Sequence, residues 1–267
     1  MRHTPVRLVQ FTDLHLYGSA DGCLRGIATR PALEAALALA RRREAQWDAL
    51  LLTGDLVQDD AAGYGQVREL FGASTVPVYC IPGNHDEIGA MRAALAAQPF
   101  QIGGTACHGE WLLVMLDSYL QGMTAGRVGE QELERLDAAL AAHPGRHALV
   151  CLHHHPVPMG SRWLDSVRLE NPAALFDVLD RHSNVRLLVW GHVHQAWEGT
   201  RRGVRLLCTP STCAQFKPGS DGFAIDQRPP GYRWFRLHAD GRADTGVEWV
   251  ESERLAAEEP QARSSAG

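Results

Sequence analysis

Five short polar motifs, each placed directly after an apolar run, constrain the fold of this 267-residue chain more than any other feature. Short runs rich in valine, leucine and isoleucine are typical of buried strands. In open α/β sheets, the loops after the strands converge on one crevice, where ligands bind. We therefore expect five strand ends to bring the motifs together. The motifs are Asp13-Leu14-His15, Gly54-Asp55, Gly83-Asn84-His85-Asp86, His153-His154-His155-Pro156 and Gly191-His192-Val193-His194.

Amphipathic helix candidates alternate with these strand candidates, which is typical of β-α-β organisation. After His194 the pattern changes to short apolar runs without a helix between them, and we interpret these runs, at 204–208, 232–237 and 245–250, as neighbouring strands of a second sheet. The other predicted strands are 6–11, 49–52, 76–81, 148–152 and 185–190, and the predicted helices are 31–46, 65–71, 88–97, 129–142 and 171–182.

The composition, 45% hydrophobic and 21% charged, is that of a soluble globular protein. Because the motifs use most of the length, we expect one α/β domain over residues 1–250. Residues 251–267, rich in Glu, Ala, Ser and Arg, contain little that could pack into a core, and we expect a mobile tail.

Composition also argues against several classes of protein. No apolar run approaches the roughly 20 residues of a membrane span, and the N-terminus lacks an apolar signal segment. The six cysteines form no C-x-x-C pair, which favours a reducing cytoplasm. A net charge of −5 gives no general attraction to nucleic acid. The sequence leaves the oligomeric state open.

The motif residues supply metal ligands of mixed type. Asp13 and His15 are separated by one residue, so that in an extended strand end both side chains point to the same face. Asp55 has two oxygens with which to bridge two cations, and Asn84 offers a neutral oxygen. Carboxylate, carbonyl and imidazole ligands without thiolate favour iron, manganese or zinc over copper(I), and we expect iron, manganese or both, with zinc as the alternative.

His85 is the candidate acid or base. It follows Asn84 directly and cannot easily reach the same ion, which leaves its imidazole free for proton transfer. Asp86 is the residue that we expect to orient this imidazole through a hydrogen bond.

In this order, the five motifs resemble those of the calcineurin-like metallophosphoesterase superfamily, over residues 13 to 194. The resemblance implies a four-layer αββα sandwich, with two mixed sheets flanked by helices, and a binuclear metal centre. The implied ligands are Asp13, His15, Asp55 and His194 for one ion, and Asp55, Asn84, His153 and His192 for the other.

The histidine triplet leaves the register of one ligand open. Aligned on Pro156 and Pro158, the chain resembles the family's His-His-Pro-Pro-x-Pro pattern, in which the first histidine is the ligand. That alignment selects His153, and His154 is the alternative.

The mechanism that the resemblance implies is hydrolysis, in which two metals lower the pKa of a bridging water and hold phosphate oxygens for in-line attack. His85 would protonate the leaving oxygen. The substrate contacts implied are His15, Asp55, Asn84, His85 and His194.

Three stretches, 152–165, 191–195 and 208–218, look like the bacterial class III 3′,5′-cyclic-AMP phosphodiesterases. The resemblance implies hydrolysis of cyclic AMP to 5′-AMP, and Trp163 or Phe216 could stack on the base or belong to the core. The alternatives are a broader phosphodiesterase acting on glycerophosphodiesters or other small diesters, and a non-catalytic scaffold.

Overall fold

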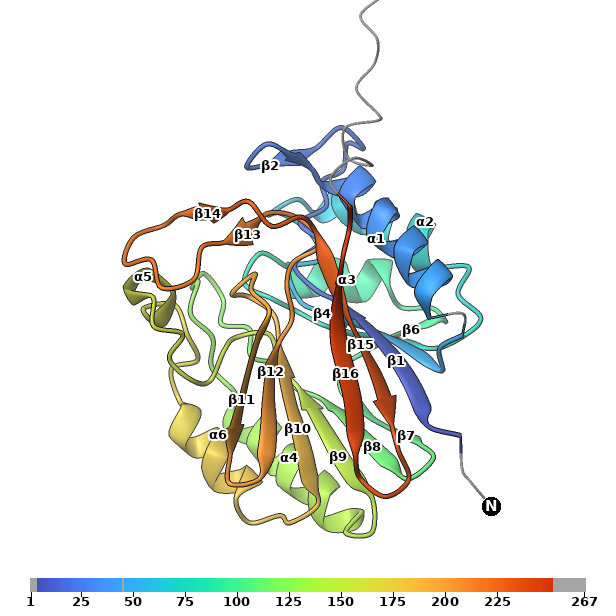
Figure 1. Ribbon diagram of the computed structural model, residues 1–267, viewed down its shortest axis with the longest axis vertical. Helices are drawn as coiled ribbons and strands as arrows, with labels where there is room; N and C mark the ends of the chain where they lie inside the picture. Colours follow the sequence, from blue (N-terminus) through green and yellow to red (C-terminus); the bar gives the residue numbers. More distant parts are fainter. Residues whose placement is uncertain (1–3, 45, 252–267) are drawn as a thin grey trace, which may run out of the picture.

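Two six-stranded sheets packed face to face form the centre of the computed structural model, which describes residues 4–44 and 46–251 (Figure 1). The first sheet has the strand order β16 (Ala243–Trp249), β15 (Gly231–Leu237), β1 (Val6–Phe11), β4 (Ala49–Thr53), β5 (Val78–Ile81) and β6 (Phe100–Ile102). The second has the order β11 (Trp197–Arg201), β12 (Val204–Cys208), β10 (Val185–Trp190), β9 (His147–Cys151), β8 (Trp111–Met115) and β7 (Gly104–His108).

Helices cover the outer face of each sheet. The first sheet packs against α1 (Thr29–Arg43), α2 (Tyr64–Phe71) and α3 (Ile88–Ala94). The second packs against α4 (Glu130–Ala142) and α6 (Pro172–Leu179). The predicted αββα sandwich is therefore confirmed. Within the described residues, no helix is both long and apolar enough to cross a membrane.

The strands read as continuous apolar runs because both of their faces are buried. In β4, Leu51 packs between the two sheets, whereas Leu50 and Leu52 pack beneath the helices of the first sheet. Alternate side chains of one strand thus serve two cores, as the pleat of a strand requires.

One sequence prediction about the sheets is wrong. The three runs after His194 do not form a sheet of their own: β12 pairs parallel with β10, whereas β15 pairs antiparallel with β1 and carries β16 at the sheet edge. An apolar run predicts a strand but not its partner. The sequence reading also omitted β6, β7 and β8, although β8 is a fully buried apolar run.

The topology brings the predicted loops to one edge. Because β1, β4 and β5 are parallel, as are β9 and β10, the carboxyl ends within each set point the same way. Small elements lie beyond these ends, and several of them are labelled in Figure 1. They are the hairpins β2 (Cys23–Leu24) with β3 (Ile27–Ala28) and β13 (Gln215–Phe216) with β14 (Ile225–Asp226), the helix α5 (Arg162–Asp165) and the 3-10 turn η1 (Ala61–Gly63).

The domain boundary at residue 250 stays a prediction. The tail predicted over 251–267 lies, apart from Glu251, outside the described residues.

Candidate metal centre

The loops that follow five strands meet at this edge, and the seven predicted ligands gather there. Both sheets contribute to the cluster. Asp13 and His15 follow β1, Asp55 follows β4, Asn84 follows β5, His153 follows β9, and His192 and His194 follow β10.

The first predicted ligand set is close-packed. Nε2 of His194 lies 3.3 Å from Oδ1 of Asp13 and 3.1 Å from Nε2 of His15. Nε2 of His15 lies 3.9 Å from Oδ2 of Asp55. Two imidazole nitrogens and two carboxylates thus face one point, which is an arrangement that fits a cation.

The second set adjoins the first through Asp55. Nε2 of His153 lies 3.4 Å from Oδ2 of Asp55. Ligand atoms of His153 and His192 are within 4.8 Å of each other. Oδ1 of Asn84 is buried and accepts no hydrogen bond from the part of the chain that the structure describes. Asp55 therefore contacts residues of both sets, which suits the bridging role.

Three of the histidines are oriented by backbone carbonyls. The Nδ1–H of His153 donates to the carbonyl of Thr53 at 2.8 Å, and that of His194 donates to Ala214 at 2.6 Å. His192 uses Nε2 instead, 3.1 Å from the carbonyl of Val167. Each ring is thereby oriented with its other nitrogen available to a metal, which is how histidine ligands are commonly fixed.

The backbone around the ligands is not the extended conformation that the sequence predicted. β1 ends at Phe11 and β10 at Trp190, before the ligands begin. Left-handed backbone in residues other than glycine is strained, and it persists where the surroundings fix it. The residues concerned are Asp13 (φ 54°), His15 (φ 49°), Asp55 (φ 50°), His192 (φ 65°) and His194 (φ 48°).

Hydrogen bonds between loops hold this conformation. The N–H of Asp13 donates to the carbonyl of Gly54 at 3.0 Å, and that of His15 donates to the carbonyl of Asp55 at 2.9 Å. The backbone N–H of His192 donates to the Asp13 carboxylate at 3.0 Å. The two ligands of the Asp-x-His motif gather because neighbouring loops clamp them, and strand alternation plays no part.

Glycine is required at position 54. Its φ is 95°, and a Cβ there would overlap the ring of His153. The motif glycine therefore allows the His153 ring to lie directly against the backbone that carries Asp55.

Charge in the cluster is concentrated and buried. Burial raises the pKa of Asp55, but His153 outweighs it and holds the pKa of this carboxyl well below its ordinary value. Burial lowers the pKa of His153, but Asp55 and Asp13 reverse this and raise it to about 9. Burial depresses the pKa of His15 to about 4. Two buried carboxylates thus attract positive charge, which bound cations would supply.

His85 lies beside the cluster, and the prediction of its partner is wrong. Its Nδ1 lies 2.9 Å from Oδ2 of Asp59, an exposed residue of the loop after β4 that sequence reasoning missed. Asp86 instead accepts hydrogen bonds from the N–H groups of Leu56 and Gly83 and from the hydroxyl of Tyr64. Adjacency in sequence suggested Asp86, but the turn directs its carboxylate inward, beneath the ligand loops.

The histidine triplet divides into three environments. His153 faces both predicted carboxylate ligands, with Nε2 4.0 Å from Oδ1 of Asp13. His154 is tied through Nδ1 to the hydroxyl of Ser118 at 2.9 Å, and one of its ring nitrogens lies within 4.8 Å of ring nitrogens of His153 and His192. His155 stacks against His192 with ring centroids 5.5 Å apart. Of the three, His153 is the one within 4.0 Å of both carboxylates, and Nε2 of His154 is also buried without a hydrogen-bond partner in the described residues, so the choice of His153 stays a prediction.

The donor set passes a test of fit for metal ions. Buried nitrogen or oxygen atoms that lack a hydrogen-bond partner in the described residues include Oδ1 of Asn84, Nε2 of His153 and Nε2 of His154. Buried polar atoms are rarely left unpaired in folded proteins, so such a cluster calls for a ligand. Two of the three belong to the predicted second site.

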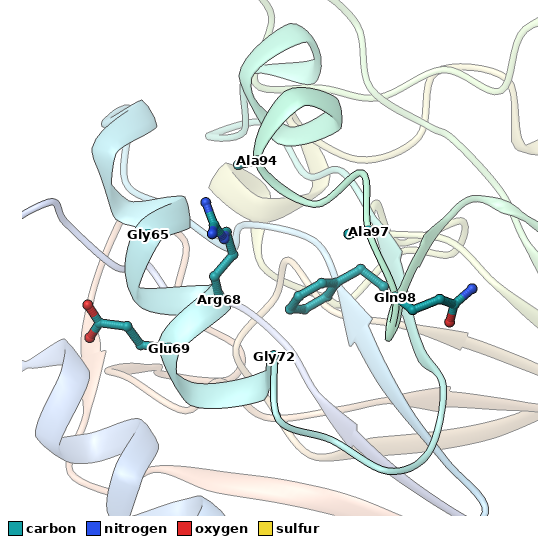
Figure 2. Close-up of a pocket in the computed structure, with 8 residues that line it drawn as sticks. Gly65, Arg68, Glu69, Gly72, Ala94, Ala97 and Gln98 are labelled. Carbon is teal, nitrogen blue, oxygen red and sulfur yellow. The ribbon is translucent and has the colours of Figure 1, made fainter.

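A cavity of about 280 Å³ opens onto this centre and is lined by His15, Asp55, Asn84, His85, His192 and His194. Its other wall is apolar and includes Trp163, Phe216 and Phe223. A larger cavity, about 560 Å³, lies away from the centre, between α2 and the segment after α3 (Figure 2). None of the predicted ligands lines that second cavity, where Arg68 and Glu69 are the charged residues.

The family model for the calcineurin-like phosphoesterases matches residues 6–196, which contain every ligand described above. The chain belongs to this family. It is 40% identical to the 3′,5′-cyclic adenosine monophosphate phosphodiesterase CpdA of Pseudomonas aeruginosa, over 92% of this chain and 90% of that protein. It is also 40% identical to CpdA of Escherichia coli strain K12, over 91% and 89% of the two chains.

Solved structures support the fold. A dimetal phosphatase from Danio rerio superposes with a TM-score of 0.65 at 17% identity, over 93% of this chain and 100% of that one. A purple acid phosphatase from yellow lupin superposes with a TM-score of 0.61 at 14% identity, over 96% and 56%.

Proposed function

We propose that this chain is a metal-dependent phosphodiesterase that hydrolyses 3′,5′-cyclic AMP to 5′-AMP. One observation carries the proposal: seven donor side chains cluster at one edge, and five of them line one cavity with His85, in a chain 40% identical over most of its length to cyclic-AMP phosphodiesterases. Membership of the family supports the phosphoester chemistry of the proposal, and the similarity to these relatives supports its substrate.

Two transition-metal ions are the cofactors of this proposal. Asp13, His15, Asp55 and His194 would hold one, and Asp55, Asn84, His153 and His192 the other. When bound, such a pair supplies an activated water and positive charge for the phosphate oxygens. We propose iron, manganese or both, with zinc as the alternative, because the donors are oxygen and imidazole.

The chain's own groups complete the reaction. Formation of 5′-AMP breaks the bond between phosphorus and O3′ of the ribose, so O3′ must gain a proton. His85 lines the cavity, and its Nδ1 is held by Asp59, which leaves Nε2 to donate that proton. Burial lowers the pKa of His85, but Asp55 and Asp59 outweigh it and raise the pKa, which favours the protonated acid. His15, Asp55, Asn84 and His194 would contact the phosphate beside it.

The main alternative is a broader phosphodiesterase acting on glycerophosphodiesters or other small diesters, because the same metal centre could serve either substrate. A non-catalytic scaffold is a weaker alternative, since such a protein would be expected to lose ligands or His85. The proposal includes no nucleic-acid partner. The cytoplasm is the proposed location, and all six cysteines are free thiols.

One assay separates these functions. The metal-reconstituted protein is given cyclic AMP, cyclic GMP and glycerophosphocholine at equal concentrations. The proposal expects the highest kcat/KM on cyclic AMP. A higher kcat/KM on glycerophosphocholine would support the broader enzyme, and metal-loaded protein without turnover of any diester would support the scaffold.

A further inference from the structure

Three aromatic rings line the same cavity as His85. Trp163 of α5 lies with its ring centroid 5.1 Å from that of Phe216 and 5.2 Å from that of Phe223, and the two phenylalanines are 5.5 Å apart. The phenylalanines belong to the β13–β14 hairpin, Phe216 in β13 and Phe223 in the connecting loop. The wall is therefore built by elements outside the two sheets.

These rings differ in what they can still contact. Phe216 stacks on the candidate ligand His194, with centroids 4.0 Å apart and planes inclined by 10°. One face of Phe216 is thus already occupied by the metal centre. Phe223 is 47% exposed and lines the same cavity. Ligand cavities are lined mainly by apolar and aromatic side chains, so this open ring beside the metal centre is available to a ligand.

Arg25 covers part of the exposed ring. It lies in the turn of the β2–β3 hairpin, with φ of 52°, and its guanidinium carbon is 4.7 Å from the centroid of Phe223. Arg25 forms no ion pair with any carboxylate in residues 4–44 and 46–251. A planar cation held over an aromatic ring, at the rim of a cavity, occupies the place that a flat heterocycle would take.

We infer that Phe223 and Arg25 form a subsite for the purine base of the nucleotide, in which the base takes the place of the guanidinium on the Phe223 ring and Arg25 moves outward to cover the other face of the base. This inference rests on the proposed function, because it takes the phosphate to lie at the metal centre. Both partners recognise a π-face, and neither demands a particular exocyclic group. The subsite therefore selects purine over pyrimidine by stacking area and separates adenine from guanine only weakly.

Equilibrium binding to the metal-loaded protein tests the subsite without turnover. Calorimetry gives Kd for 5′-AMP, for 5′-CMP and for ribose 5-phosphate, which carries the phosphate and sugar but no base. In the wild type we expect AMP to bind about tenfold or more tightly than ribose 5-phosphate, with CMP between them. Phe223→Ala should bring the AMP value close to that of ribose 5-phosphate, and Arg25→Ala should weaken AMP by about two- to fivefold.

Ile225→Ala is the matched control. Ile225 lies on the same hairpin and is 40% exposed, but it does not line the cavity. The ratio of the Kd for ribose 5-phosphate to the Kd for 5′-AMP should be unchanged in this variant. A Phe223→Ala protein that keeps the wild-type ratio would overturn the subsite, whether both ligands bind as in the wild type or both are weakened equally.

Failure of the subsite and failure of the proposed function give different results. Wild type that binds AMP through Phe223 but does not hydrolyse cyclic AMP would retain the subsite and reject the substrate. If the wild type and the Phe223→Ala variant both hydrolyse cyclic AMP with the same KM, the function would be retained and the subsite rejected.

Discussion

The metal centre and the mouth of its cavity, which is formed by the hairpins at residues 23–28 and 215–226, are built in opposite ways. The centre follows long strands of both sheets, and its imidazoles and carboxylates are at most 6% exposed. The mouth consists of two-residue strands and carries Phe223 and Ile225, which are 47% and 40% exposed. Two-stranded ribbons of this size are only marginally stable. The comparison shows that the large sheets position the candidate ligands, whereas small and partly exposed elements carry the surface proposed for the base.

The largest effect should come from removing the carboxylate shared by both ligand sets. Asp55→Ala is expected to lose both metal ions and all phosphodiesterase activity, whereas Asp13→Ala should lose mainly one ion. Chelation of the wild type should abolish activity as well. Metal-to-protein ratios measured by elemental analysis decide the first point. An Asp55→Ala protein that retained two ions per chain would show that the bridge is assigned wrongly.

The next effect tests the register of the histidine triplet. His153→Ala should remove one ion, because its Nε2 lies 3.4 Å from the shared carboxylate. His154→Ala should keep both ions and mainly lower stability, because it removes a buried ring bonded to Ser118. Metal content and thermal unfolding of the two variants separate these roles, and the reverse pattern would move the ligand by one residue.

A smaller loss is expected at His85, which is proposed to handle a proton and no metal. His85→Ala should keep its metals and lose about 10²–10⁴-fold in turnover of cyclic AMP. A diester with a nitrophenolate leaving group needs little protonation and should lose much less. Equal losses on both substrates would contradict the role of His85 as an acid and would indicate that it acts on phosphate binding or metal geometry.

The smallest effect should be found at the mouth. Arg162 of α5 pairs with Asp221 of the β13–β14 loop at 3.0 Å, and both side chains are largely exposed, at 82% and 74%. Because water screens such a pair, Arg162→Ala should change the free energy of unfolding by less than about 1 kcal/mol. Urea denaturation measures this, and a much larger loss would mean that the mouth is built as firmly as the centre.

The sequence predicted the centre better than the mouth, for a physical reason. Buried strands leave a clear apolar pattern, and the position of a ligand directly after a strand follows from that pattern. The sequence could not show the left-handed backbone at Asp13 or His192, because loop contacts from other strands impose it. Nor could it choose between Asp59 and Asp86 as the partner of His85, since that choice depends on how two loops face each other.

The hairpins and the edge strands β6, β7 and β11 escaped prediction because their sequences are short and only partly buried, whereas the edge strand β16 was predicted at 245–250. The pairing of β15 with β1 escaped because it joins segments more than 200 residues apart, Val6 with Leu237 among them. No local pattern encodes such a pair. The aromatic character of Trp163 and Phe216 was visible, but their roles differ: both pack against the core, and Phe216 also supports His194.

The division of the ligands between the sheets has a mechanical consequence. Asp13, His15, Asp55 and Asn84 come from loops of the first sheet, and His153, His192 and His194 come from loops of the second. An ion held by both groups would cross-link the two sheets, so that separating them would also require releasing the metal. Ligands that bind only the native state add about 2.7 kcal/mol to its stability at 100 times their Kd. The cations that make the centre reactive would therefore also hold its two walls together.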